Sequence, residues 1–163
     1  DGDGLEDVFI ASGNGNHALY SRTGDPIVNW AKAAGLSGPD TLPYEDPDGD
    51  TVLNWQEFAF NMNPAVADKH DLAPGGDSGL PTIQVDKVGT QHRFTGMAIR
   101  PVGISTLTYK IEDGYNLSMG NYRLQAVGSG TAVSTTHKRV EVQIWSQPTE
   151  PLLFGRMIVT FTP

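Results

Sequence analysis

The second half of the chain alternates apolar and polar residues in six short segments, each bounded by turn residues. Successive side chains of a strand point to opposite faces of a sheet, so this period predicts strands that bury one face. Short strands at this spacing, rich in Val, Ile, Thr and Tyr, predict an antiparallel β-sandwich over residues 82–163. The segments are TIQVDKV (82–88), RFTGMAIR (93–100), LTYKIED (107–113), YRLQAVG (122–128), KRVEVQIW (138–145) and FGRMIVTFT (154–162).

The last of these segments carries apolar residues on both faces of the predicted strand. Met157, Val159 and Phe161 share one face, and Ile158 lies on the other. We therefore expect this strand to be central in its sheet or covered on both sides.

Ahead of the strands, residues 26–64 follow a helical period instead. Asp25 can cap a helix that has a proline in its first turn and ends at Gly35. A second helix is predicted from about Leu53 to Met62. The apolar residues of the first helix recur at the spacing of one buried face: Ile27, Trp30, Ala31 and Ala34. The segment is expected to form a helix–loop–helix unit.

Residues 65–81, AVADKHDLAPGGDSGLP, read as a linker because they are rich in Pro, Gly and Asp and have no apolar period. Asp68, His70 and Asp71 lie within it. Neighbouring loop residues point apart, and no partner histidine is suitably spaced. We expect neither a catalytic nor a metal cluster from these residues.

The loop between the two predicted helices, EDPDGDTVLNWQE, crowds carboxylates that repel one another unless a cation lies among them. Counted from Asp46, oxygen ligands fall at the first, third, fifth, ninth and twelfth places, and the seventh place needs only its backbone carbonyl. This is the spacing of an EF-hand calcium loop. The alternative is an acidic turn that caps a helix. The predicted Ca²⁺ ligands are Asp46, Asp48, Asp50, Val52, Asn54 and Glu57.

Thr51 departs from that pattern, because the sixth place is normally a glycine with positive φ. A β-branched residue adopts such a conformation at a cost of about 1–3 kcal/mol. Either Gly49 absorbs part of the turn, or the loop is a dockerin-like variant with weaker affinity.

Residues 1–25 contain a second acidic cluster. Asp1, Asp3 and Asp7 match the third, fifth and ninth places of another calcium loop, whose first ligand would lie upstream. The segments DVFIAS and HALYSR then predict two strands around the turn GNGN. This stretch resembles one FG-GAP repeat, an integrin-propeller unit that carries a calcium loop. A propeller needs several blades, so the hairpin is either one blade of an array or part of another fold. The alternative is a flexible Asp/Gly-rich terminus.

Composition narrows the function classes. The net charge is −8, with 19 acidic and 11 basic residues and no basic stripe, so nucleic acid is not an expected partner. The absence of cysteine excludes disulfides and zinc–thiolate sites. No apolar stretch is long enough to predict insertion into a membrane. A cysteine-free chain with calcium loops suits an extracellular or cell-surface location in bacteria.

Several pieces carry a wider resemblance: WAKAAGLSG, DPDGDTVLNWQEFAFNMNP, LAPGGDSGLP, LTYKIED and FGRMIVTFTP. In this order, from about Ile27 to the end, the chain resembles a C-terminal module of large secreted proteins of Verrucomicrobia and Planctomycetes. The resemblance implies an extracellular, calcium-dependent accessory or assembly module without known enzymatic activity.

Two functions are therefore weighed. The first is a calcium-binding structural module of a cell-surface or filamentous homopolymer, in which a neighbouring subunit completes the N-terminal loop or pairs with a sheet edge. The alternative is a carbohydrate-binding or adhesion module that uses exposed aromatic residues. A hydrolase is not expected, because no paired carboxylates or G-x-S-x-G motif stand out. The candidate sugar-stacking residues are Tyr109, Tyr115, Tyr122 and Trp145.

Overall fold

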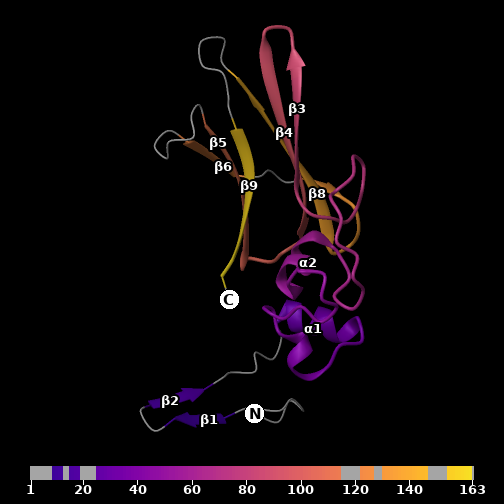
Figure 1. The fold of residues 1–163 in the computed structure, drawn as a ribbon, viewed down its shortest axis with the longest axis vertical. Coiled ribbons are helices and arrows are strands. Elements are labelled where there is room, and N and C mark those ends of the chain that lie inside the picture. The colour runs from indigo at the N-terminus through magenta and orange to yellow at the C-terminus, as the bar shows by residue number, and fades with distance from the viewer. Residues whose placement is uncertain are drawn as a thin grey trace.

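The described part of the chain consists mainly of antiparallel β-strands, with two short α-helices ahead of the larger sheets (Figure 1). The structure is a computed structural model that describes residues 9–12, 15–18, 25–114, 122–126, 130–146 and 154–162. Its elements are β1 (Phe9–Ser12), β2 (Gly15–Ala18), α1 (Pro26–Ala33), the 3₁₀ helix η1 (Gly38–Thr41), α2 (Asn54–Phe60), β3 (Thr82–Val88), β4 (Gln91–Pro101), β5 (Leu107–Gly114), β6 (Tyr122–Ala126), β7 (Thr131–Ala132), β8 (His137–Trp145) and β9 (Phe154–Phe161).

Two antiparallel sheets make up the β-rich half. One has the strand order β3-β4-β8-β7 and the other β6-β5-β9. Figure 1 shows α1 and α2 together at one end of these sheets. Each segment whose alternation predicted a strand forms one, and the short β7 was not predicted. Period-two alternation is therefore a faithful guide to this half of the chain.

Strand β9 lies at the edge of its sheet, paired with β5. Of the two arrangements expected for this strand, the central position is wrong among the described strands. Met157, Val159 and Phe161 pack on the main core, and the Phe161 ring stacks on Trp55 of α2 at 5.8 Å. The burial of this face therefore comes from packing against α2 and the core, and it does not depend on how many strands pair with β9.

Helix α1 begins and ends as its sequence predicts. The Asp25 side chain accepts a hydrogen bond from the Ile27 backbone N–H at 2.8 Å, which caps the first turn. At the other end Gly35 has φ 97°, and the Leu36 N–H donates to Ala31 O at 3.1 Å. A left-handed glycine closes the helix in this way.

The helical segment and both sheets share one hydrophobic core. Trp30 of α1 meets Phe58 of α2 edge to face, with ring centroids 5.5 Å apart. Strands of each sheet add apolar side chains to the same cluster, so the helices and the β-rich half fold around a common centre. Its buried members are Ile27, Val52, Phe58, Ala59, Phe60, Met62, Ala98, Leu107, Tyr109 and Val140.

The C-terminal end of α2 is held by both sheets. A helix leaves its last four carbonyls without intrahelical partners. Here the His137 Nε2–H of β8 donates to Phe58 O at 2.8 Å, and the Tyr109 hydroxyl of β5 donates to Ala59 O at 3.0 Å. Burial lowers the pKa of His137 below 6.5, although its bond to Phe58 opposes the shift. The ring is therefore a neutral donor.

The two remaining carbonyls at this end are also satisfied. The Met62 N–H donates to Glu57 O at 2.9 Å, and the Gly79 N–H donates to Phe60 O at 3.1 Å. Gly79 has φ 120°, and a Cβ there would lie 2.8 Å from the Leu72 backbone nitrogen. The chain can cross itself here because this residue has no side chain.

The segment predicted as a linker packs against the larger sheet. The Leu72 N–H donates to Leu80 O at 2.9 Å. The Leu72 side chain is 2% exposed and clusters with Met97 and Ile99 of β4. The segment is thus anchored at its centre and leads directly into β3.

Near the N-terminus, β1 and β2 pair antiparallel from Phe9↔Ala18 to Ser12↔Gly15. The predicted hairpin is present in these residues, but its second strand begins at Gly15, inside the expected GNGN turn. The carboxylates of the predicted partial calcium loop, Asp1, Asp3 and Asp7, lie outside the described residues.

Candidate metal centre

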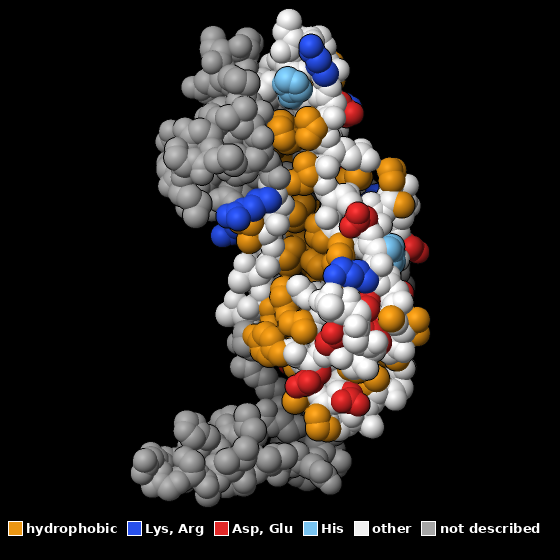
Figure 2. Space-filling model, viewed as in Figure 1, with side chains coloured by type: hydrophobic (Ala, Val, Ile, Leu, Met, Phe, Trp, Pro, Cys, Tyr) orange, Lys and Arg blue, Asp and Glu red, His pale blue; other side chains and the backbone are white. Residues whose placement is uncertain are grey.

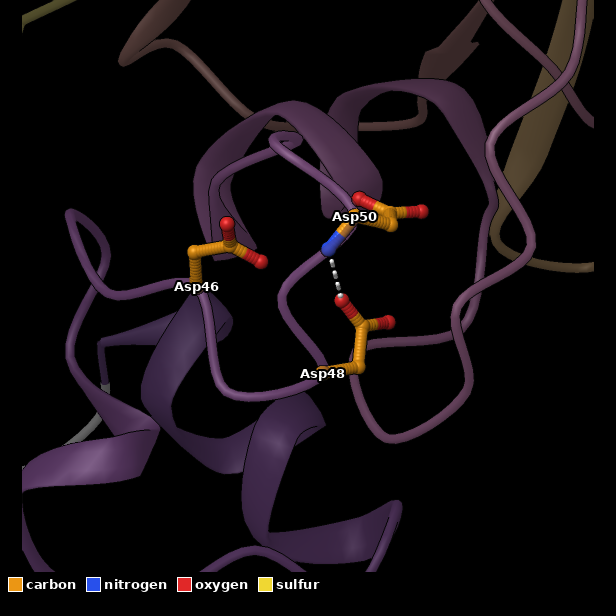
Figure 3. Close-up of side chains that lie close together, drawn as sticks. All are labelled: Asp46, Asp48 and Asp50. Atoms are coloured by element: carbon orange, nitrogen blue, oxygen red, sulfur yellow. Dashed lines mark hydrogen bonds between the residues drawn. The ribbon is translucent and has the colours of Figure 1, made fainter.

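Three aspartates lie together on the loop between η1 and α2 (Figure 3). One carboxylate oxygen from each of Asp46, Asp48 and Asp50 lies within 4.8 Å of the others. Backbone N–H groups fix them: Gly49 donates to Asp46 Oδ1 at 3.0 Å, and Asp50 donates to Asp48 Oδ1 at 3.1 Å. The Val52 N–H donates to Asp50 Oδ1 at 2.8 Å. These bonds hold three like charges close together.

Thr51 adopts the backbone conformation that its place in the loop requires. Its φ is 75°, in the region that favours glycine, and Gly49 has φ 77°. The Thr51 N–H donates to Asp46 Oδ2 at 3.0 Å, and the Lys69 ammonium donates to Thr51 Oγ1 at 2.6 Å. The loop therefore keeps its turn with a threonine in place of glycine, and these two bonds offset part of the strain.

Glu57 is the most unusual carboxylate in the described chain. It is 0% exposed, and neither of its side-chain oxygens has a hydrogen-bond donor among the described residues. Burial raises its pKa to about 8, with further contributions from the charges of Asp48, Asp50, Asp68 and Asp46. A buried carboxylate without a partner is costly, so this position demands either a proton or a cation.

Asp48 shares this environment. Its Oδ2 is buried and has no donor in the described part of the chain. Burial raises the pKa of Asp48, and the nearby charges of Asp50 and Asp46 raise it further, although the hydrogen bond from the Asp50 N–H opposes the shift. Two neighbouring carboxylates thus have oxygens that protein donors leave unsatisfied.

Asp68 joins the site from the segment predicted as a linker. One oxygen from each of Asp50, Glu57 and Asp68 lies within 4.8 Å of the others, and Asp68 Oδ1 is buried without a described donor. We expected no metal cluster from this segment, and the grouping of Asp68 with Asp50 and Glu57 departs from that expectation. His70 and Asp71 are in neither carboxylate group. Asp68 lies beyond the twelve-residue pattern, so no spacing rule identifies it.

Val52 and Asn54 have structural contacts in addition to their predicted places in the loop. The Val52 side chain is 2% exposed and belongs to the main core. Asn54 is fully buried, and its Nδ2 donates to Asp40 O at 2.7 Å and to Leu42 O at 2.8 Å. Its Oδ1 has no donor among the described residues. Asn54 thus ties the loop to the end of η1 and leaves an oxygen acceptor free.

The donor set of the group would suit a hard cation. All its donors are oxygens, and Figure 2 shows acidic side chains gathered over the end of the molecule that carries the helices. Ca²⁺ takes six to eight oxygen ligands in flexible geometry, whereas zinc and copper sites favour histidine and cysteine. The residues that could hold a cation are Asp46, Asp48, Asp50, Glu57 and Asp68.

The candidate sugar-stacking aromatics are less favourably placed. Tyr109 is 7% exposed and donates to a helix carbonyl, so the expectation that its ring is available for stacking is wrong. Trp145 is 38% exposed, with the Arg93 guanidinium 5.7 Å from its ring centroid. The side chains of Tyr115 and Tyr122 lie outside the described residues.

Comparisons of the chain with protein-family models, curated proteins and solved structures find no match. Within the described residues, no helix has both the length and the apolar character needed to cross a membrane.

Proposed function

We propose that this chain is a calcium-binding structural module, with the ion held by loop 46–57. The supporting observation is Glu57, which is fully buried beside the loop aspartates and whose two side-chain oxygens have no partner among the described residues. Glutamate at the last place of such a loop binds Ca²⁺ through both oxygens, so one ion would give both Glu57 oxygens a partner.

The place of α2 in the fold supports a structural role. The helix that carries Glu57 contributes side chains to the shared core, and its carbonyls accept hydrogen bonds from His137 and Tyr109, one from each sheet. An ion that fixes this helix stabilises the contact between the helical segment and the sheets. We propose further that the two sheets pack face to face as a β-sandwich.

Calcium melts test the proposal. With calcium at one hundred times its Kd, binding to the folded state adds about 2.7 kcal/mol, or a Tm rise of about 5–10 °C for a chain of this size. Glu57→Gln should lose this rise and, in chelator, should melt above the native protein because it removes the cost of burying a carboxylate or of protonating it. Asp77→Asn is the matched control, since Asp77 is exposed and belongs to neither carboxylate group. A native protein whose Tm ignores calcium contradicts the proposal.

We also propose that the module works outside the cell and associates with further copies of itself. The support for self-association is the position of β9 at an edge among the described strands, where Met157, Ile158 and Val159 are half-buried. An edge strand can pair with a strand of another chain. Light scattering and electron microscopy with calcium should detect oligomers or filaments, and monomers alone at high concentration would contradict self-association. A glycan array tests the adhesion alternative.

A further inference from the structure

We propose that Asp68 is a ligand of the same ion, so that calcium clamps the segment 65–72, here called the strap, onto loop 46–57. This inference rests on the proposed function and goes beyond it. It adds a ligand outside the loop and a second part of the chain whose position depends on the ion.

The first argument is the placement of the Asp68 carboxylate. It lies within 4.8 Å of oxygens of Asp50 and Glu57, which are carboxyl groups as well. Ionised carboxylates at this distance repel one another unless a proton or a cation lies among them. Asp68 Oδ1 is buried and has no donor in the described chain. The fully buried Glu57, with two unpartnered oxygens, points to a cation at the same place.

The second argument is the set of contacts around Asp68. The Lys69 N–H donates to Asp50 Oδ2 at 2.8 Å, and the Lys69 ammonium donates to Thr51 Oγ1 at 2.6 Å. The described chain gives the ammonium no ion pair with the carboxylates of this site. Lysine therefore positions the strap on the loop but does not itself neutralise the cluster.

Neighbouring residues fix the turn that presents Asp68. The His70 Nδ1–H donates to Asp68 O, 2.5 Å away, and the ring Nε2 lies 3.3 Å from Ser78 Oγ. Leu72 then anchors the next part of the strap in its cluster with Met97 and Ile99. The ion would thus connect the loop to a segment that is itself fixed to the larger sheet.

Calorimetric calcium titration of four proteins tests this ligand. Asp68→Asn should weaken calcium binding at least about tenfold, the scale on which ligand number and charge tune such sites. Asp71→Asn is the matched control, because Asp71 is an exposed aspartate of the same strap that joins neither carboxylate group. Glu57→Gln should abolish binding. In chelator, Asp68→Asn should melt no lower than the native protein, which shows that it folds.

Trypsin provides a second readout, since Lys69 is exposed and adjoins Asp68. Calcium should slow cleavage after Lys69 more than cleavage after Lys87 near the β3–β4 turn, and Asp68→Asn should remove this difference. Native affinity and protection in Asp68→Asn would overturn the inference and leave the loop site intact. An equal loss of affinity in Asp71→Asn would assign the effect to general charge and also overturn it. No binding by the native protein would instead remove the proposed function itself.

Discussion

Helix α2 brings two buried polar groups of opposite character within one turn of each other. At its C-terminal end the carbonyls of Phe58, Ala59 and Phe60 each accept a hydrogen bond from a distant part of the chain. Beside them Glu57 is equally buried, yet neither side-chain oxygen meets a donor in the described chain. The first group is complete and the second is not.

Among the described residues, the second group lacks a partner for its carboxyl oxygens. Native proteins pair nearly all their buried polar atoms, and the C-terminal end of α2 follows this rule. Loose packing therefore does not explain the unpartnered oxygens of Glu57, Asp48 and Asp68. Each additional N–H or O–H donor would form a hydrogen bond with one of these oxygens, whereas a single cation can be coordinated by several of them. The comparison predicts that calcium alters the second group and leaves the first unchanged.

The largest expected effect is a pH dependence that only the carboxylate group produces. The folded-state pKa of Glu57 is about 8, above its ordinary 4.5, so the unfolded chain releases this proton first as pH rises. In chelator, the contribution of Glu57 to the free energy of unfolding should be lost between about pH 4.5 and 8, at no more than about 1.4 kcal/mol per pH unit and so by up to about 5 kcal/mol in all. The part of this loss between about pH 6.5 and 8 is the one to measure. Thermal melts across this range measure the slope.

His137 sets the lower limit of that range. Its folded-state pKa lies below 6.5, so its contribution to stability is present above that pH and is lost as pH falls further. Glu57→Gln in chelator should show a flat profile above pH 6.5, and calcium should flatten the native profile because the ion replaces the proton. An unchanged slope in the Glu57→Gln variant would show that Glu57 is not the source of the pH dependence.

The next largest effect concerns the completed group. His137→Ala leaves Phe58 O without its donor and opens a cavity beside a buried ring, which should reduce the free energy of unfolding by about 3 kcal/mol. Urea titration measures this loss. The Tm rise caused by calcium should remain, with the partly exposed His92→Ala as control. Loss of the calcium response in His137→Ala would show that the two groups are not independent.

A smaller loss is expected from Tyr109→Phe, which removes only the hydroxyl that donates to Ala59 O. The variant keeps the ring in the core, so the change in the free energy of unfolding should be about 1–2 kcal/mol. Urea titration checks it, and the calcium affinity should stay within about twofold of the native value because the loop is untouched. A loss below the error of the titration would mean that this carbonyl needs no partner.

The smallest effect should be a gain. Thr51→Gly relieves a positive φ of 75° but also removes the oxygen that Lys69 contacts, so the calcium-bound protein should gain no more than about 1 kcal/mol. Melts of both proteins in saturating calcium measure the difference. Thr51→Val is the control, since it keeps the β-branched shape and lacks the hydroxyl. A large loss in Thr51→Gly would show that the hydroxyl, and not the turn, maintains the loop.

What could be predicted from the sequence depends on how far apart the interacting residues lie. The candidate ligands Asp46, Asp48 and Asp50 follow a fixed spacing within one short loop, and the strands follow a period of two. Asp68 and His137 take their roles from the tertiary fold. His137 lies 79 residues from the carbonyl that it contacts, a distance that no local pattern encodes.

The surroundings of β9 could not be predicted for the same reason. Its apolar residues indicate burial, but the sequence does not say which element packs on them. Trp55 of α2 packs on Phe161 here. Burial could thus be read from composition, whereas the identity of the neighbour could not.

The crossing at Gly79 has a consequence for sequence tolerance. Two stretches of main chain meet there with no side chain between them: a Cβ would lie 2.8 Å from Leu72 N and 2.9 Å from Asp71 C. No rotamer change can relieve a clash with backbone atoms, so even alanine is excluded unless the chain moves. In chains that share this architecture, variation in the surrounding loop should therefore stop at this one residue.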